Sequence, residues 1–183
     1  MHRKTALKAL AGCLMILLAM GSVAYAAPSP EKIAGLKFSG TLSEADQQYL
    51  GLEKPGPFTL QDIKAPYVLI EITRTTCPHC VDQAPVVNRL YNLVAKSDLK
   101  DKVKFQAVGE SDNGASLQRF KAAYTVPFPM VPDPDWEIGV DLFHVSGTPT
   151  TVLVDKSGKV LLTEVGFFDN AGAMFKKIKA KLK

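Results

Sequence analysis

One stretch of this chain constrains its fold more than any other. It consists of a short apolar run, a helix-like repeat and a second apolar run. Tyr67–Ile72 is rich in β-branched and apolar residues, which is typical of a strand buried on both faces. Apolar residues then recur at three- and four-residue spacing from Val87 to Val94, as in a helix packed on a sheet. Val103–Val108 indicates the next strand, ending at Gly109. This order predicts parallel strands joined by a right-handed crossover.

The rest of the chain adds helices and a hairpin to this unit. The further helices are expected at Ala115–Tyr124, at Asp135–Phe143 directly after Pro134, and at Asn170–Leu182. Thr150–Val154 and Val160–Val165 flank a turn signal that ends in Gly158, so these two strands should be antiparallel. Together the patterns predict an α/β fold with a central mixed sheet flanked by helices.

The first residues have the features of a secretory leader. Arg3, Lys4 and Lys8 precede the uncharged stretch Ala9–Ala27, and Ala24-Tyr25-Ala26 has the small-x-small pattern of a cleavage site. We therefore expect residues 1–26 to be a signal peptide. An uncleaved membrane anchor is the main alternative, because about 19 uncharged residues can span a bilayer. A lipoprotein box at Cys13 fits less well, since the apolar core continues beyond it. Each outcome places the remaining chain in the periplasm or otherwise outside the cytoplasm.

Charge argues against one class of partner. The chain has 22 Lys and Arg against 18 Asp and Glu, and three of those cations lie in the leader. Without them the net charge is close to zero, so nucleic acid is not an expected partner. Residues 27–57 are expected to form an N-terminal extension with a helix that begins after Ser43 and ends at Gly51. Residues 58–183 are expected to form the main domain.

The cysteines point to redox chemistry. Beyond Cys13 the chain has only Cys77 and Cys80, so there is no framework of structural disulfides. A domain of about 157 residues can bury a core without one. Cys77 lies where the helix after the buried strand should begin, and a helix N-terminus favours the thiolate. Cys80 lies one turn further, where it can attack a mixed disulfide on Cys77. We therefore expect a redox-active Cys77–Cys80 pair.

The two residues between the cysteines fit the same interpretation. Pro78 suits a first helical turn because it has no N–H group to leave unpaired. His79, when protonated, would stabilise a thiolate on Cys77. Zinc is not expected, because beyond the leader only His79 and His144 could complete a four-ligand site with the cysteines. A Cu(I)-binding module that uses the two thiols stays open as a different class of function.

Four features together resemble the thioredoxin superfamily over nearly all of residues 58–183. They are the Cys-Pro-His-Cys motif, Pro85, the Gly147-Thr148-Pro149-Thr150 loop, and Glu71 six residues before Cys77. The resemblance implies a thioredoxin fold without a bound cofactor. It also implies a cis Pro149 and a Thr148 backbone that binds an extended substrate. It makes buried Glu71 a proton acceptor for Cys80. The alternatives are an ordinary trans proline and a Glu71 that faces solvent or pairs with a lysine.

Within that superfamily the layout resembles the extracytoplasmic TlpA/ResA-like redoxins. Pro57–Ile63 and Pro127–Pro129 carry this resemblance. It implies a thiol–disulfide oxidoreductase that reduces protein disulfides, for example in cytochrome c maturation, with a membrane-borne or soluble redox partner. Thr76 departs from the tryptophan that usually precedes the first cysteine. The Pro78-His79 dipeptide resembles the strongly oxidising DsbA proteins. A DsbA-like oxidant is therefore the alternative direction of exchange. A thiol peroxidase is disfavoured, because the Pro-x-x-x-Thr-x-x-Cys pattern is absent around Cys77.

Overall fold

The computed structural model describes residues 29–183, so the expected leader and Cys13 lie outside the described residues. The helices are α1 (Pro30–Ala34), α2 (Glu44–Leu50), α3 (Pro78–Ala95), α4 (Gly114–Ala123), the π-helical segment η1 (Glu137–Leu142) and α5 (Ala171–Lys181). The strands are β1 (Lys37–Phe38), β2 (Phe58–Thr59), β3 (Tyr67–Thr73), β4 (Val103–Glu110), β5 (Met130–Asp133), β6 (Thr150–Asp155) and β7 (Val160–Val165). Within this part of the chain, none of the helices has the length and apolar character needed to cross a bilayer.

Five strands form one mixed sheet in the order β5-β4-β3-β6-β7. β3 pairs in parallel with β4, and β4 pairs in parallel with β5. β6 pairs antiparallel with both β3 and β7. The parallel β3–α3–β4 unit and the antiparallel hairpin expected from the sequence are therefore confirmed.

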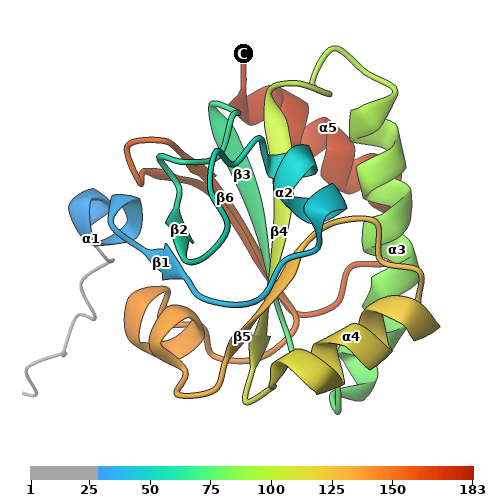
Figure 1. Ribbon diagram of the computed structural model, residues 1–183. Coiled ribbons are helices and arrows are strands. Elements are labelled where there is room, and N and C mark those ends of the chain that lie inside the picture. The colour runs from blue at the N-terminus through green and yellow to red at the C-terminus, as the bar shows by residue number, and fades with distance from the viewer. Residues whose placement is uncertain (1–28) are drawn as a thin grey trace, which may run out of the picture.

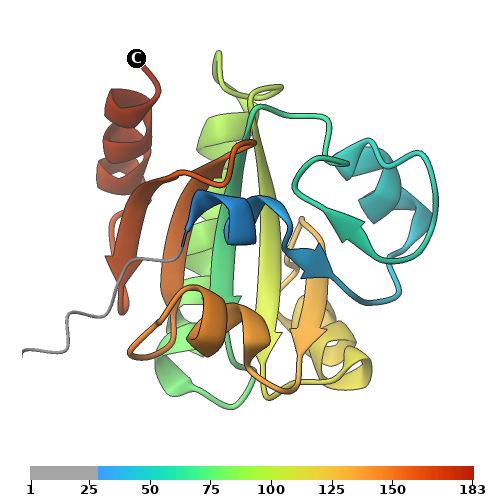
Figure 2. The ribbon, with the colours of Figure 1, turned by 90° about the vertical axis from the view of Figure 1, so that its left-hand side faces the viewer.

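Both faces of this sheet are covered, which explains the continuous apolar run in β3. The long helices α3, α4 and α5 pack on one face around Leu69, Leu90 and Phe105. On the other face lie α1, the small β1–β2 pair and η1, in front of the sheet in Figure 2. Successive side chains of β3 thus enter two different cores, and every residue from Val68 to Thr73 is buried. In Figure 1, α3 and α5 lie on one side of the sheet, and α1 and the β1–β2 pair lie on the other.

The N-terminal segment contributes to the second core. Ile33, Phe38 and Leu50 are each fully buried there. Pairing of β4 with β5 begins at Ala107, and the earlier part of that β4 edge meets α2 instead. The Phe105 N–H donates to the Tyr49 hydroxyl at 2.8 Å, which satisfies an edge group that no strand reaches.

The helix predicted at Asp135–Phe143 is present but shorter, and its turns are π-helical. Residues Met130–Asp133 form an edge strand, where Pro132 is tolerated because an edge need not donate on both sides. Trp136 then adopts a left-handed backbone with φ of 65°. The Asp133 carboxylate accepts the Ile138 and Gly139 N–H groups at 3.0 and 2.9 Å, so the wider π-turns begin at Glu137. Pairing with β5 also carries β4 past the expected end at Gly109 to Glu110.

Candidate redox site

The two cysteines lie at the N-terminus of α3, just after the buried strand β3. Cys77 caps the N-terminus of α3 with an extended backbone, and Pro78 occupies the first turn. The Cys77 carbonyl accepts the N–H groups of Cys80 and Val81, each at 3.1 Å. Cys77 is partly exposed, whereas Cys80 is 2% exposed. One helical turn therefore holds one accessible and one buried thiol.

The loop before β6 meets the accessible thiol. The Thr148–Pro149 peptide bond is cis, which confirms the expected geometry of this loop. The Cys77 thiol donates to the Thr148 carbonyl at 3.4 Å. The Pro149 carbonyl accepts the Gly166 N–H at 2.8 Å, so the segment after β7 supports the loop. Residues about seventy positions apart are thus brought to the same edge of the sheet.

The two thiols have opposite pKa shifts. Partial burial alone would raise the pKa of Cys77, but hydrogen bonds with Cys80, with the Thr148 side chain and with the His79 backbone outweigh it and lower the pKa. Burial raises the pKa of Cys80 to about 11, and hydrogen bonds with its surroundings offset this only in part. At neutral pH the outer thiol is therefore the better source of thiolate.

The segment that leads into Cys77 is held by a buried carboxylate. Asp112 accepts the Thr75 N–H at 2.8 Å and the Thr75 hydroxyl at 2.5 Å. The same carboxylate accepts the Ser116 hydroxyl at 2.8 Å, which ties the segment to the first turn of α4. Charge-assisted bonds of this kind restrict the approach to α3, so the position of Cys77 is well determined.

A second set of contacts covers the neighbouring surface. Arg74 donates to Glu110 at 3.0 Å, and its guanidinium lies 5.2 Å from the ring centre of Trp136. The indole N–H of Trp136 donates to the Ser111 hydroxyl. Trp136 is still 42% exposed. An arginine and an exposed tryptophan therefore stand beside the loop that carries Cys77.

Glu71 lies beneath the cysteines and faces the interior. Its side chain is 5% exposed, so the solvent-facing alternative does not hold. Gln83 donates to Glu71 Oε1 at 2.9 Å and Thr151 donates to Oε2 at 2.6 Å. Burial raises the pKa of Glu71 to about 7, although both hydrogen bonds oppose the shift. A small cavity of about 20 Å³ is lined by Glu71 and Cys80 together with Thr73.

The other expected site residues are at the surface. His79 is exposed on the first turn of α3, and Pro85 lies exposed inside the same helix. Sequence reasoning missed Gln83 and Asp112. Gln83 had a usable signal, because it is a polar residue on the apolar face of α3, three residues after Cys80 and four before Val87. Asp112 had none, because its partner Thr75 lies 37 residues earlier.

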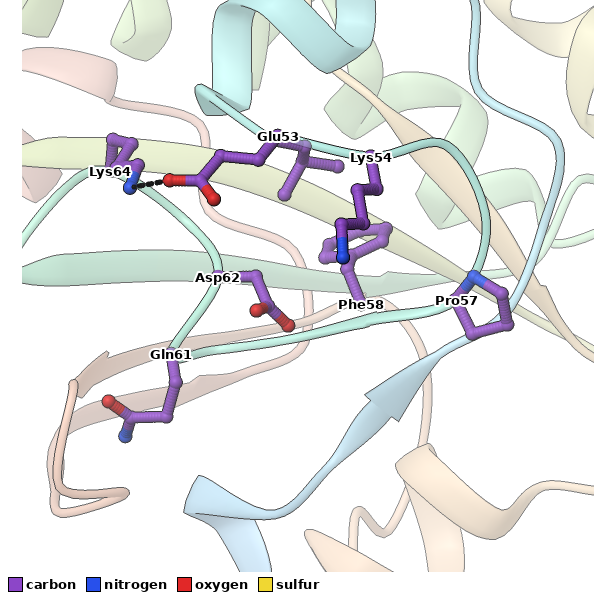
Figure 3. Close-up of a pocket in the computed structure, with 8 residues that line it drawn as sticks. Glu53, Lys54, Pro57, Phe58, Gln61, Asp62 and Lys64 are labelled. Carbon is purple, nitrogen blue, oxygen red and sulfur yellow. Dashed lines mark hydrogen bonds and ion pairs between the residues drawn. The ribbon is translucent and has the colours of Figure 1, made fainter.

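A polar surface pocket of about 290 Å³ is separate from this site (Figure 3). It lies between the segment after α2 and the segment after β2, and it is lined by none of the redox-site residues described in this section. Lys64 and Glu53 pair there at 2.8 Å while both remain mostly exposed. Within residues 29–183 there is also no group of three or more His, Cys, Asp or Glu side chains arranged for a metal ion.

Comparison with known proteins places these features in a wider context. Residues 38–182 match the Redoxin family. Thiol-disulfide oxidoreductase ResA of Bacillus subtilis (strain 168) is 28% identical over 167 residues, 91% of this chain and 88% of that protein. The structure of a putative thiol:disulfide interchange protein DsbE from Chlorobium tepidum is 29% identical. It has a TM-score of 0.59 and covers 70% of this chain and 88% of that one. StoA from Bacillus subtilis, 20% identical with a TM-score of 0.56, covers 71% of this chain and 94% of that one.

Proposed function

The chain belongs to the Redoxin family and is a thiol–disulfide oxidoreductase, and we propose that Cys77 is its attacking thiol and Cys80 its resolving thiol. The observation that carries this assignment is the pairing of an accessible, acidified Cys77 with a buried Cys80 in one turn of α3. Only the accessible sulfur can reach a disulfide in another protein. The buried sulfur is placed to attack its neighbour.

In the reducing direction two steps move two electrons to the substrate. The Cys77 thiolate attacks one sulfur of a protein disulfide, forms a mixed disulfide and releases the first substrate thiolate. Cys80 then gives its proton to Glu71 and attacks the Cys77 sulfur. The Cys77–Cys80 disulfide forms and the second substrate sulfur leaves as a thiolate, which can then take the proton held by Glu71. A membrane-borne or soluble dithiol donor must afterwards reduce this disulfide. Because burial raises the pKa of Cys80 to about 11, the second step needs a base, and Glu71 lines the same cavity.

Thr148 and Pro149 are proposed to bind the substrate chain. The Thr148 carbonyl already lies within hydrogen-bond reach of the Cys77 sulfur. The loop formed by Thr148 and Pro149 therefore offers main-chain groups to an extended peptide beside the reacting sulfur. Pro78 and His79 line the same outer surface, and a protonated His79 would stabilise the Cys77 thiolate.

The proposed direction is reduction outside the cytoplasm, with cytochrome c maturation as the model process. The similarity to ResA and the leader-like first residues support this choice. Two features favour a DsbA-like oxidant instead. They are the Pro78-His79 dipeptide and the lowered pKa of Cys77, which stabilises the reduced form.

Disulfide trapping tests the assignment of the thiols. Cys80→Ala should accumulate mixed disulfides with a protein disulfide substrate, because Cys77 can attack but nothing resolves the product. Cys77→Ala should trap none, and equal trapping by both variants would overturn the roles. The reduction potential of the pair decides the direction: a value near about −270 mV supports a reductant, and one near about −120 mV supports an oxidant. Stoichiometric Cu(I) binding without disulfide turnover would favour the copper module.

A further inference from the structure

Gln83 links the buried carboxyl group to the segment that follows β7. It lies on α3, one turn after Cys80, and is 1% exposed. Its Nε2 donates to Glu71 Oε1 at 2.9 Å, and its Oε1 accepts the Phe168 N–H at 2.9 Å. One amide group therefore makes both contacts, and the contact with Glu71 is buried while the contact with Phe168 is partly buried.

These contacts determine which end of the amide faces Glu71. The Phe168 N–H can only donate, so the Gln83 carbonyl oxygen must face it. The NH₂ group then faces Glu71, and an amide NH₂ cannot accept a hydrogen bond. On the other side of the carboxyl group, the Thr151 hydroxyl is 2.6 Å from Oε2 and can either donate or accept. The two oxygens of Glu71 are thus not equivalent as sites for a proton.

We propose that Gln83 is a positioning residue that directs the proton taken up by Glu71 to Oε2, the oxygen beside Thr151, and stabilises the ionised carboxylate. A proton on Oε1 would point at the hydrogens of the amide. A proton on Oε2 can be donated to the Thr151 hydroxyl. The inference rests on the proposed role of Glu71 as proton acceptor for Cys80. The inference adds which oxygen of Glu71 takes the proton and assigns that selection to Gln83.

Few other groups can act on the charge of Glu71. In the described chain, Cys80 on α3 is the titratable side chain that shares its cavity. The neighbouring β6 contributes the neutral Thr151. The side chains that line the cavity from β4, α4 and β5 are Ala107, Phe120 and Met130. Burial therefore has the largest influence on the ionisation of Glu71, followed by the hydrogen bonds from Thr151 and Gln83.

Gln83→Leu tests the proposal, because leucine keeps the bulk and removes the donor. Hydrogen bonding to a carboxylate lowers its pKa, so its loss should move the pH midpoint of the resolving step upward by about one unit. A midpoint shift of that size leaves about one tenth of Glu71 ionised at neutral pH, so release should slow about fivefold there. The rate of capture by Cys77 should be unchanged. Stopped-flow measurement of both steps against pH gives the result.

Gln83→Glu separates the two halves of the amide. A carboxylate at this position still accepts the Phe168 N–H but cannot donate to Glu71. We expect its release midpoint to rise at least as far as that of Gln83→Leu. Recovery of the wild-type midpoint would mean that the anchor to Phe168 matters and the donor does not, which overturns the proposal. Asn88→Leu is the matched control, because it removes an amide from the same helix that bonds only the Tyr124 and Thr125 carbonyls. It should leave the midpoint in place.

A direct titration of the carboxyl group keeps the test decisive. NMR of ¹³C-labelled glutamate in the dithiol protein reports the pKa of Glu71 without any turnover. We expect a rise in Gln83→Leu and none in Asn88→Leu, and an unchanged pKa in Gln83→Leu overturns the proposal. If Glu71→Gln leaves release unchanged, the role of Glu71 as base fails, and the titration still decides what Gln83 does. If Glu71→Gln slows release but Gln83→Leu shifts neither midpoint nor pKa, only the assignment of Gln83 fails.

Discussion

The redox site has an outer half and an inner half, and the two halves shift the pKa of a cysteine thiol in opposite directions. The outer half consists of Cys77, His79 and Thr148 at the N-terminus of α3. The inner half consists of Cys80, Glu71 and the side chains buried around them. Cys77 is accessible and its pKa is lowered, whereas Cys80 is 2% exposed and its pKa is raised to about 11. Three residues along one helix are enough for this contrast, because one turn moves the sulfur from the helix end into the core.

The contrast separates the two steps of exchange. Capture needs a thiolate that another protein can reach, which the outer half supplies without a base. Release needs a thiol that is held back until a mixed disulfide has formed, and then a proton acceptor beside it. In the proposed mechanism the inner half supplies both by burial, because desolvation holds the proton on Cys80 and also raises the pKa of Glu71. The following experiments test this division.

Alkylation should show the largest difference between the halves. The pKa of Cys80 lies at about 11 and that of Cys77 below 9.0, so the thiolate fractions at neutral pH differ by more than about a hundredfold. Limited iodoacetamide treatment of the dithiol protein, followed by mass spectrometry, should find the label on Cys77. Comparable labelling of Cys80 in the folded protein would remove the contrast.

Glu71→Gln should damage the inner half alone. The amide keeps the shape of the side chain but cannot take the proton of Cys80, so release should slow by about a hundredfold while capture is unaffected. Single-turnover kinetics with a chromogenic disulfide separates the two steps. Equal release rates in the two proteins would leave Glu71 with a structural role only.

The stability of the protein should depend on pH through the same carboxyl group. Folding raises the pKa of Glu71 from 4.5 to about 7, so the folded state binds the extra proton between these values. The stabilisation is complete below about pH 4.5 and is lost as the pH rises through about 7, a change on the order of 3 kcal/mol. Relative to Glu71→Gln, the wild-type Tm should therefore fall by roughly 6 °C from pH 5 to pH 8 in calorimetry. Parallel curves for the two proteins would contradict the raised pKa.

His79→Thr should have the smallest effect and should act on the outer half. An imidazolium at His79, two residues after Cys77, would stabilise the Cys77 thiolate and so the reduced form by about 0.2–1 kcal/mol, the range for exposed ion pairs. Its loss should lower the reduction potential by roughly 5–20 mV. Redox titration against glutathione measures this shift. An unchanged potential would make His79 a passive exposed residue.

The sequence predicted the parts of the site that depend on local pattern. The motif from Cys77 to Cys80, the strand before it and the helix after it are neighbours in the chain, so periodicity and helix-end chemistry were sufficient. The general resemblance to the redoxins is confirmed by the match of residues 38–182. The strand β5 was missed because Pro132 masks its pattern, and the segment after it forms π-turns on the carboxylate of Asp133.

The tertiary structure decided how this motif is supported. Glu71 meets Thr151 across 80 residues, Thr75 meets Asp112 across 37, and Gln83 meets Phe168 across 85. Contacts at such separations depend on the pairing of β3 with β4 and with β6 and on the packing of α3 against the sheet, and no short stretch of the sequence contains these. The sequence by itself determined that two thiols stand at a helix N-terminus after a buried strand. Only the tertiary structure determines which thiol is buried and which oxygen of Glu71 faces the Gln83 amide. It therefore also determines where a proton can bind, because desolvation and hydrogen bonding are properties of packed neighbours.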